Sequence, residues 1–366
     1  MPEKSSKKRA QKYRFINIKT GAIRPKASIL IIYAGGTIGM VRDSTGALVA
    51  LKFNQIMQQL PSLTALNVAI TVISFPDPMD SSNMDYHNWI ELGQIIYENY
   101  QHYDGFVVLQ GTDTMAYSAS ALSFMLEHLN KPVIFTGAQL PISAIRSDAR
   151  SNLITAIEIA SRMIGSRPLV PEVGIYFDYQ LLRGNRASKV RSSQFAAFES
   201  ENYPLLAKIG ITIEFNKTVI HRYIKDQELV FHSKFDPNVV ILKLFPSITR
   251  EVIEDILHIK GLKGLVMESY GSGNAPTMDW FIQVLKKAID RGIVIYNVSQ
   301  CPGGKVIHGR YATSTQLQKI GVISGWNITT EAAITKLMYV LGHEADFDRI
   351  SHLLSTPLRG EMDIGI

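Results

Sequence analysis

The sequence predicts a two-domain α/β protein, with a larger N-terminal domain built on a mainly parallel sheet flanked by helices and a smaller C-terminal α/β domain. Three observations support this prediction. The chain has 366 residues and 46% hydrophobic content, and a single domain usually takes about 100–200 residues. Short β-rich runs alternate with segments of helical period. A polar stretch interrupts this alternation, which then begins again.

The N-terminal domain is predicted to span residues 27–215, where four β-rich runs alternate with helical segments. The expected strands lie at residues 28–34, 105–110, 132–137 and 173–178. A helix is predicted over residues 114–129, and Ser147 can cap another helix between the third and fourth strands. Strand, helix and strand in this order imply a parallel sheet.

The polar residues 216–237 are predicted to be a linker, and residues 238–366 are predicted to form the C-terminal domain. The expected strands of this domain lie at residues 239–246, 264–271 and 292–300. A helix is predicted to begin at Thr277 and to stop at Gly292. The second half is therefore expected to be an α/β domain rather than a lid.

Residues 1–26 are predicted to be a basic, mobile arm. They contain nine Lys or Arg and one acidic residue, Glu3, so this segment carries +8 of a whole-chain net charge of +6, and the remaining residues carry −2 and are close to neutral. A solvated tail is the expected role, and non-specific attraction to polyanions is the alternative. We expect no specific nucleic-acid partner.

The cysteine and hydropathy patterns indicate a cytoplasmic protein. Cys301 is the only cysteine, which excludes an intrachain disulfide and a cysteine-rich zinc site. The apolar runs are shorter than the ~20 residues of a membrane helix, and the basic start lacks the apolar stretch of a secretory signal. We expect no membrane partner.

Two hydroxyl-bearing turns after predicted strands are the first candidates for a functional site. The turn GGTIG at residues 35–39 presents Thr37, and GTDT at residues 111–114 presents Thr112 and Asp113 at the start of a helix, beside N–H groups that could hold an oxyanion. Ligands bind beyond the carboxyl ends of parallel strands, so the two turns together favour a site. Taken singly, each is more simply a tight turn or a helix cap.

Lys189, in the segment LLRGNRASK, could reach Asp113. Such a pair would orient Thr112 and help to accept its proton, as in a catalytic triad built from other residues. A surface lysine in a basic loop is the alternative. The sequence contains no GxSxG, HExxH or GxxxxGK[ST] motif, and YGSGNAP matches a dinucleotide-binding motif only in part.

YAGGTIGM and LQGTDTMAYSASALSFMLE closely resemble the two signature segments of the L-asparaginase family, and TGAQLPI, LLRGNRASK, SYGSGN, SQCPGGKV, YATS and LRGEMD occur in that family's order. The second segment and the LRGE ending resemble the cytoplasmic, bacterial type I branch. The resemblance covers residues 27–362 and implies the two-domain asparaginase fold. It also implies hydrolysis of L-asparagine to L-aspartate and ammonia by a homotetramer, a dimer of dimers, without metal or cofactor.

The resemblance assigns roles to four of these residues. Thr37 matches the nucleophile, which forms a β-aspartyl ester with the enzyme. Thr112, Asp113 and Lys189 match the second threonine and its proton relay, which also positions water.

Four further residues match substrate-binding positions of the family. Asp80 and Ser81 match the contacts to the substrate's α-amino and α-carboxylate groups, although residues 80–83 could also cap the following helix. Ala138 matches the residue whose carbonyl receives the side-chain amide. Asn274 is a candidate for the group that a neighbouring subunit donates.

The sequence departs from the family pattern in two places. Ala47 occupies the slot where many members have a tyrosine that activates the nucleophile, and Tyr311 is the candidate replacement, with a packing role as its alternative. Type I enzymes can carry a second, allosteric asparagine site, and Cys301 matches one of its residues. Glu268 and Ser188 stand where that site has arginine and threonine, so we expect a weak or absent allosteric response.

Three other functions stay open at this point. Glutaminase-asparaginase activity is one, because one methylene group changes binding by only ~1–3 kcal/mol. An ammonia-supplying subunit of a tRNA-dependent amidotransferase is another, and a non-catalytic amino-acid-binding module is the third. The presence of Thr37, Thr112, Asp113 and Lys189 together disfavours the binding module.

Overall fold

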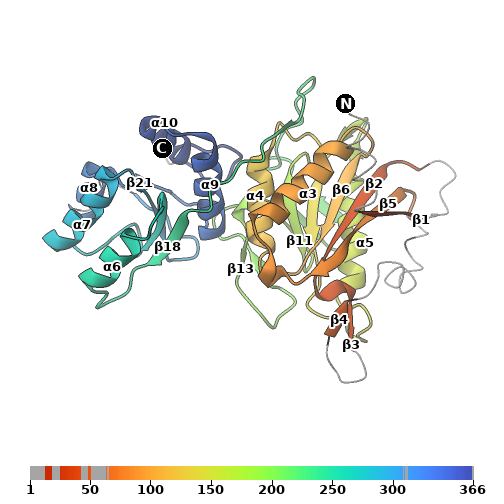
Figure 1. Cartoon of the computed structure of the whole chain (residues 1–366). Coiled ribbons are helices and arrows are strands. Elements are labelled where there is room, and N and C mark those ends of the chain that lie inside the picture. The colour runs from red at the N-terminus through yellow and green to blue at the C-terminus, as the bar shows by residue number, and fades with distance from the viewer. Residues whose placement is uncertain are drawn as a thin grey trace, which may run out of the picture. The chain divides into compact units, whose positions relative to one another are not determined.

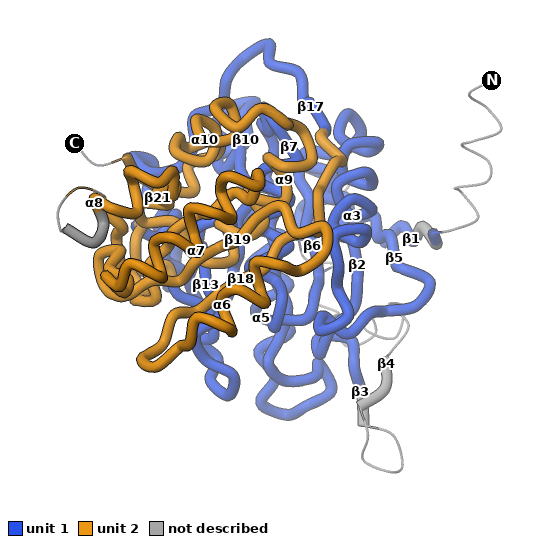
Figure 2. Tube along the Cα trace, turned by 60° about the vertical axis from the view of Figure 1, so that its left-hand side comes forward, with its two compact units in different colours: residues 1–199, 204–231 blue, residues 200–203, 232–366 orange. Residues whose placement is uncertain are grey.

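The computed structural model describes residues 13–18, 25–42, 48–50, 63, 66–307, 309 and 312–364. The chain forms two compact units (Figure 2): unit 1 contains residues 1–199 and 204–231, and unit 2 contains residues 200–203 and 232–366. This division falls inside the predicted linker of residues 216–237. Much of that stretch is folded onto unit 1, because Asn130 exchanges hydrogen bonds with the backbone of Ile224.

Unit 1 is built on a nine-stranded sheet with the strand order β1-β5-β2-β6-β8-β11-β12-β15-β16 (Figure 1). The strands are β1 (Arg14–Ile18), β2 (Ser28–Gly35), β5 (Ala69–Met79), β6 (Gly105–Leu109), β8 (Val133–Thr136), β11 (Val173–Phe177), β12 (Gln180–Arg183), β15 (Ala207–Ile209) and β16 (Ile213–Phe215). The central strands from β5 to β11 are parallel, whereas the edge strands pair in antiparallel fashion. The predicted, mainly parallel sheet is confirmed.

Three helices accompany this sheet: α3 (Tyr86–Asn99), α4 (Met115–Met125) and α5 (Ala149–Ala160). In the view of Figure 1, α3 and α4 lie in front of the sheet. Every residue of β6, β8 and β11 is buried, which explains why these strands read as unbroken apolar runs in the sequence. The remaining elements are short: η1 (Thr37–Gly39), β3 (Met40–Arg42), β4 (Leu48–Ala50), η3 (Ser81–Asn83), β7 (Leu126–Glu127), β9 (Met163–Ile164), β10 (Arg167–Pro168), η4 (Gly184–Arg186), β13 (Ser188–Lys189), β14 (Phe198–Glu199) and β17 (Val230–Phe231).

Strand β1 corrects the prediction that residues 1–26 are a mobile arm throughout. Residues 14–18 pair with residues 70–74 of β5 at the edge of the sheet. The ring of Tyr13 packs against Phe75, with ring centroids 5.9 Å apart, and its hydroxyl hydrogen-bonds to Glu91. The high local charge hid a strand-like alternation, in which exposed Asn17 separates the partly buried Ile16 and Ile18.

Two predicted helices are shorter than expected. The helix expected over residues 114–129 ends at Met125, because residues 126–127 pair with β17. The helix expected from Thr277 is α7 (Asp279–Asp290), with Met278 at its N-cap. The predicted stop is present, since Gly292 has a positive φ of 91° directly after the helix.

Unit 2 contains a four-stranded parallel sheet with the order β18-β19-β20-β21. Its elements are β18 (Val239–Lys243), α6 (Arg250–Leu257), β19 (Gly264–Ser269), α7, β20 (Val294–Ser299), α8 (Ala312–Lys319), β21 (Ile323–Ser324), α9 (Thr330–His343) and α10 (Phe347–Ser355). Leu265 and Met267 of β19 share a core with Phe281 of α7, whereas Gly264 lies against Leu337 of α9. Alternate residues of β19 therefore pack against helices on opposite faces. No described helix combines the length and apolar character needed to cross a membrane.

Candidate active site

The ends of β2, β5 and β6 meet through glycines. A Cβ added to Gly35 (φ 135°) would lie 2.2 Å from the carbonyl oxygen of Met79, and one added to Gly36 (φ 91°) would lie 2.3 Å from the backbone nitrogen of Gly111. Both the positive φ values and the close contacts require glycine at these positions. The backbones that lead into Thr37 and Thr112 are therefore in direct contact.

The same packing extends to the neighbouring strand ends. A Cβ on Gly111 would lie 2.5 Å from the hydroxyl oxygen of Ser81, and one on Gly137 would lie 2.5 Å from the carbonyl oxygen of Gln110. Thr37 begins η1 directly after this contact region, and its side chain is partly exposed. The turns after the first two predicted strands thus converge as expected, and the end of β5, which was not predicted, contacts both of them.

Lys189 links the second threonine to its neighbouring carboxylate. Its Nζ donates a hydrogen bond to Thr112 Oγ1 at 2.8 Å and to Asp113 Oδ1 at 2.5 Å. Only 15% of the Lys189 side chain is exposed, so the alternative of a surface lysine is wrong. Asp113 does not cap α4, because the N-cap residue is Thr114. The carboxylate is 66% exposed and is free to face solvent or a ligand while it holds the ammonium group.

Gln139 is a member of this network that the sequence did not reveal. Thr112 Oγ1 donates to Gln139 Oε1 at 3.3 Å, while Gln139 Nε2 donates to the carbonyl oxygens of Ser192 (3.2 Å) and Gln194 (2.8 Å). Two carbonyl acceptors can face only the NH₂ end of the amide, so the oxygen end must face Thr112. In the sequence, the feature that could have indicated this role is the amide side chain that follows Ala138 in TGAQ, at the end of a parallel strand.

Asp148 fixes the loop that carries Gln139. Its carboxylate accepts hydrogen bonds from the backbone nitrogens of Gln139 (2.9 Å) and Leu140 (3.0 Å) and from Asn152 Nδ2 (3.1 Å). Asn152 Nδ2 also donates to the carbonyl oxygen of Gly137 at 3.0 Å. The path of this loop is therefore determined by α5, at whose start Asp148 lies.

The predicted substrate-binding residues of unit 1 lie after β5 and β8. Asp80 is exposed and caps η3, where its carboxylate accepts from the backbone nitrogen and the hydroxyl of Ser82, both at 2.9 Å. The capping role considered for residues 80–83 thus applies to η3, while α3 has its own cap in Asp85. Ser81 and Ala138 are both 3% exposed and border the contact region.

The other predicted residues are not part of this cluster in the described structure. Asn274 belongs to unit 2, where it forms a backbone bridge with Tyr270. Tyr311 and Ala47 lie outside the described residues. Among the described residues, no group of three or more His, Cys, Asp and Glu side chains is arranged to hold a metal ion.

The residues matched to an allosteric site have their own contacts. Glu268 accepts a hydrogen bond from Thr330 Oγ1 at 2.6 Å and forms an ion pair with Lys243 at 3.5 Å. Cys301 is exposed. Ser188 is paired with Glu199 between β13 and β14. The Glu268 carboxylate is thus held by a hydroxyl and an ammonium group of unit 2.

Family models match both units. Residues 28–221 match the model described as "Asparaginase, N-terminal", and residues 238–354 match "Glutaminase/Asparaginase C-terminal domain". The chain belongs to the asparaginase family. It is 40% identical over 339 residues to L-asparaginase 1 of Escherichia coli strain K12, covering 92% of the chain and 98% of that relative.

A solved structure shares the fold of this asparaginase-family protein, and a further relative is similar in sequence. A crystal structure of L-asparaginase I from Vibrio cholerae has a TM-score of 0.83 at 36% identity, with 92% of this chain and 99% of that chain covered. The "60 kDa lysophospholipase" of Mus musculus is 39% identical over 94% of the chain, which spans only 64% of that relative's length. The predicted asparaginase fold is confirmed.

Proposed function

We propose that this protein hydrolyses L-asparagine to L-aspartate and ammonia. The observation that supports the proposal best is the hydrogen-bonded set Thr112–Lys189–Asp113 next to the Gly36–Gly111 contact, which brings a second hydroxyl to the end of β2. Family membership and the names of the E. coli and V. cholerae relatives agree with it.

In the proposed reaction, Thr37 Oγ attacks the side-chain amide carbon, the hydroxyl proton passes to the amide nitrogen, and the C–N bond breaks, which gives a β-aspartyl ester and ammonia. Water then cleaves the ester, which returns the proton to Thr37 and releases L-aspartate. Thr112 takes part in proton transfer. Its hydroxyl hydrogen faces Gln139 and one lone pair accepts from Lys189, so the other lone pair is available to an O–H donor such as water. Asp113 keeps the Lys189 ammonium group beside Thr112.

We further propose roles for the strand-end residues in binding substrate. The exposed Asp80 carboxylate suits the α-ammonium group, Ser81 suits the α-carboxylate, and the Ala138 carbonyl accepts the side-chain amide. Asn274 from a neighbouring subunit would complete the site, which requires the proposed homotetramer. Tyr311 is proposed to supply the hydroxyl that the Ala47 position lacks.

Location and regulation complete the proposal. The single cysteine, Cys301, suits a reducing cytoplasm.

An allosteric response to asparagine is expected to be weak, because the Glu268 carboxylate would repel the substrate's carboxylate where the type I pattern has arginine. Its contacts with Thr330 and Lys243 hold it in place within unit 2.

The first test measures ammonia release from L-asparagine and L-glutamine by the purified chain and by Thr37→Ala. We expect hyperbolic turnover that prefers asparagine and falls at least ~10³-fold in the variant, because the proposed ester forms on Thr37 Oγ. Greater turnover of glutamine would favour the glutaminase alternative. Absence of release from both amides by the wild-type chain would refute the proposal and favour an amino-acid-binding module.

Gln139→Met tests the orientation of Thr112. The variant keeps the length of the side chain but removes the whole amide, so Thr112 loses its acceptor and the carbonyl groups of Ser192 and Gln194 lose their donor. We expect kcat to fall about 3- to 10-fold from the loss of the bond to Thr112, roughly 0.5–1.5 kcal/mol, with KM unchanged. Gln194→Met is the matched control, because Gln194 contributes only its backbone carbonyl to the network. Equal kcat values for the two variants would show that Gln139 does not orient Thr112.

A further inference from the structure

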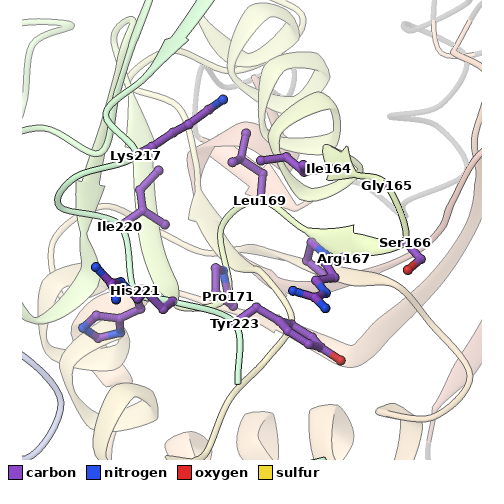
Figure 3. A pocket seen from close by; sticks show the side chains of 12 residues that line it. Ile164, Gly165, Ser166, Arg167, Leu169, Pro171, Lys217, Ile220, His221 and Tyr223 are labelled. Atoms are coloured by element: carbon purple, nitrogen blue, oxygen red, sulfur yellow. The ribbon is translucent and has the colours of Figure 1, made fainter. Parts of the chain in front are cut away.

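Unit 1 has a cavity of about 490 Å³ beside the amino end of β11 (Figure 3). One wall is residues 164–169 with Pro171, which connect α5 to the beginning of β11. The other wall is Lys217 with residues 220–223. Because both walls adjoin the amino end of β11, whereas the catalytic turns follow the carboxyl ends of β2 and β6, this cavity is separate from the proposed active site.

A buried ion pair joins the two walls. Arg183 Nε and Glu172 Oε2 are 2.6 Å apart, and both side chains are only 4% exposed. Arg183 Nη2 donates to the carbonyl oxygen of Val219 at 2.8 Å, and the backbone nitrogen of His221 donates to Glu172 Oε1 at 2.7 Å. The second wall is thereby fixed to Glu172, the residue that precedes β11, by contacts within the protein.

The lining of the cavity combines an apolar surface with positive charge. Ile164, Leu169 and Ile220 contribute aliphatic surface, and Ile164 is 53% exposed although it is a large apolar side chain. The Arg167 guanidinium group lies over the Tyr223 ring, 5.5 Å from its centroid, and Figure 3 shows the two side chains next to each other. Such stacking presents a flat, cationic face.

The positive charge of the cavity is not balanced by a nearby acid. Its charged lining residues are Arg167, Lys217 and Arg222, and no Asp or Glu lines it, while the ring of His221 lies 3.9 Å from Glu172. Within the described residues, none of the three cations has an acidic partner, and the adjacent Glu172 is neutralised by Arg183. A ligand anion would therefore meet uncompensated cations beside an aliphatic surface.

We propose that this cavity binds a small amphipathic anion, with an aromatic or aliphatic body against Ile164, Leu169 and Ile220 and a carboxylate or phosphate toward Arg167 and Lys217. The volume lies within the range of about 300–1,000 Å³ that ligand pockets occupy. A free amino acid would leave the apolar surface exposed, so the ligand differs in class from asparagine. The inference does not depend on the proposed hydrolytic function.

Calorimetric titration of the full chain with octanoate, 4-phenylbutyrate and AMP tests the proposal and separates lipid-derived from soluble anions. We expect saturable binding of one molecule per chain for at least one probe, and at least tenfold weaker binding of the matching uncharged compound: octanol, 4-phenylbutanol or adenosine. Binding should also weaken at least tenfold in Arg167→Gln/Lys217→Gln. Both residues are exposed, so this variant should fold.

Two controls make the result specific. Lys208→Gln removes an exposed cation of β15 outside the cavity and should leave affinity unchanged, and Thr37→Ala should bind the probe as well as the wild type does. Loss of binding in Thr37→Ala would place the probe in the active site and overturn the proposal. It would equally be overturned if no probe bound saturably, or if the double variant retained its affinity.

Discussion

Lys189→Met is expected to lower kcat/KM for L-asparagine by about 10²–10⁴-fold, the usual contribution of a positioned proton-transfer group. The substitution removes both the hydrogen bond to Thr112 and the partner of Asp113. Methionine is also a long, unbranched side chain and can fill most of the space of the lysine's aliphatic chain, so the fold should be unaffected. Steady-state ammonia release, with thermal unfolding as a check on folding, measures the effect.

Lys189→Arg distinguishes two ways in which Lys189 could act. If the residue only supplies positive charge beside Thr112 and Asp113, arginine should restore most of the activity. If it exchanges a proton with Thr112, arginine should fail, because a guanidinium group does not lose its proton in proteins. We expect failure, with kcat near that of Lys189→Met.

The matched control for Lys189 is Lys208→Met, which removes an exposed lysine of the same unit and should retain wild-type turnover. A Lys189→Met enzyme with turnover within threefold of the wild type would contradict the proposed proton relay.

Asp113→Asn should produce a smaller loss than Lys189→Met, because the lysine keeps its direct hydrogen bond to Thr112.

The sequence predicted the central strands of unit 1 well but missed the strands that flank them. Strands β6, β8 and β11 are buried on both faces and therefore read as apolar runs. Strand β5 was missed because AITVISFPDPM mixes polar residues with two prolines near its end, which are typical of a loop. Strand β1 was missed because its basic neighbourhood was interpreted as a tail. In both cases tertiary pairing outweighed the local pattern.

The candidate site divides in the same way. Thr37, Thr112 and Asp113 could be predicted because they follow strands, and parallel strands bring their carboxyl ends to one edge. Gln139 could not, since its orientation is set by carbonyl groups of residues 192 and 194, more than 50 positions along the chain. Contacts of this kind depend on the paths of two loops, which no local pattern determines.

The LRGE segment was recognised only as part of a family motif, and its physical role becomes clear from unit 2. Glu361 and Lys336 form a salt bridge of 2.7 Å with both side chains fully buried. Lys336 Nζ also donates to the carbonyl oxygens of Leu354 (3.1 Å) and Thr356 (2.6 Å), while Glu361 accepts from the backbone nitrogens of Leu358 and Arg359. The pair therefore attaches the segment after α10 to α9.

Lys336→Met is expected to destabilise the protein by about 3–5 kcal/mol, because it leaves the Glu361 carboxylate buried without a counter-charge. Lys336→Met/Glu361→Gln should recover part of this loss, since no buried charge remains, although the hydrogen bonds of Lys336 to Leu354 and Thr356 stay absent. Calorimetric unfolding of the wild type, both single variants and the double variant measures the coupling. Lys260→Met, an exposed lysine of the same unit, is the control.

The same pair predicts how stability depends on pH. Burial alone would raise the pKa of Glu361, but Lys336 and the backbone N–H groups outweigh it and hold the pKa below the ordinary value of 4.5. A carboxyl group whose pKa is lowered by folding contributes stability above its unfolded pKa, and this contribution is lost as pH falls through the folded pKa. The wild type should thus lose stability on acidification below about pH 4.5 more steeply than the double variant. Identical slopes for the two proteins would show that the pair does not control the loss of stability at acidic pH, and an undiminished Tm in Lys336→Met would contradict the predicted cost of the unpaired carboxylate.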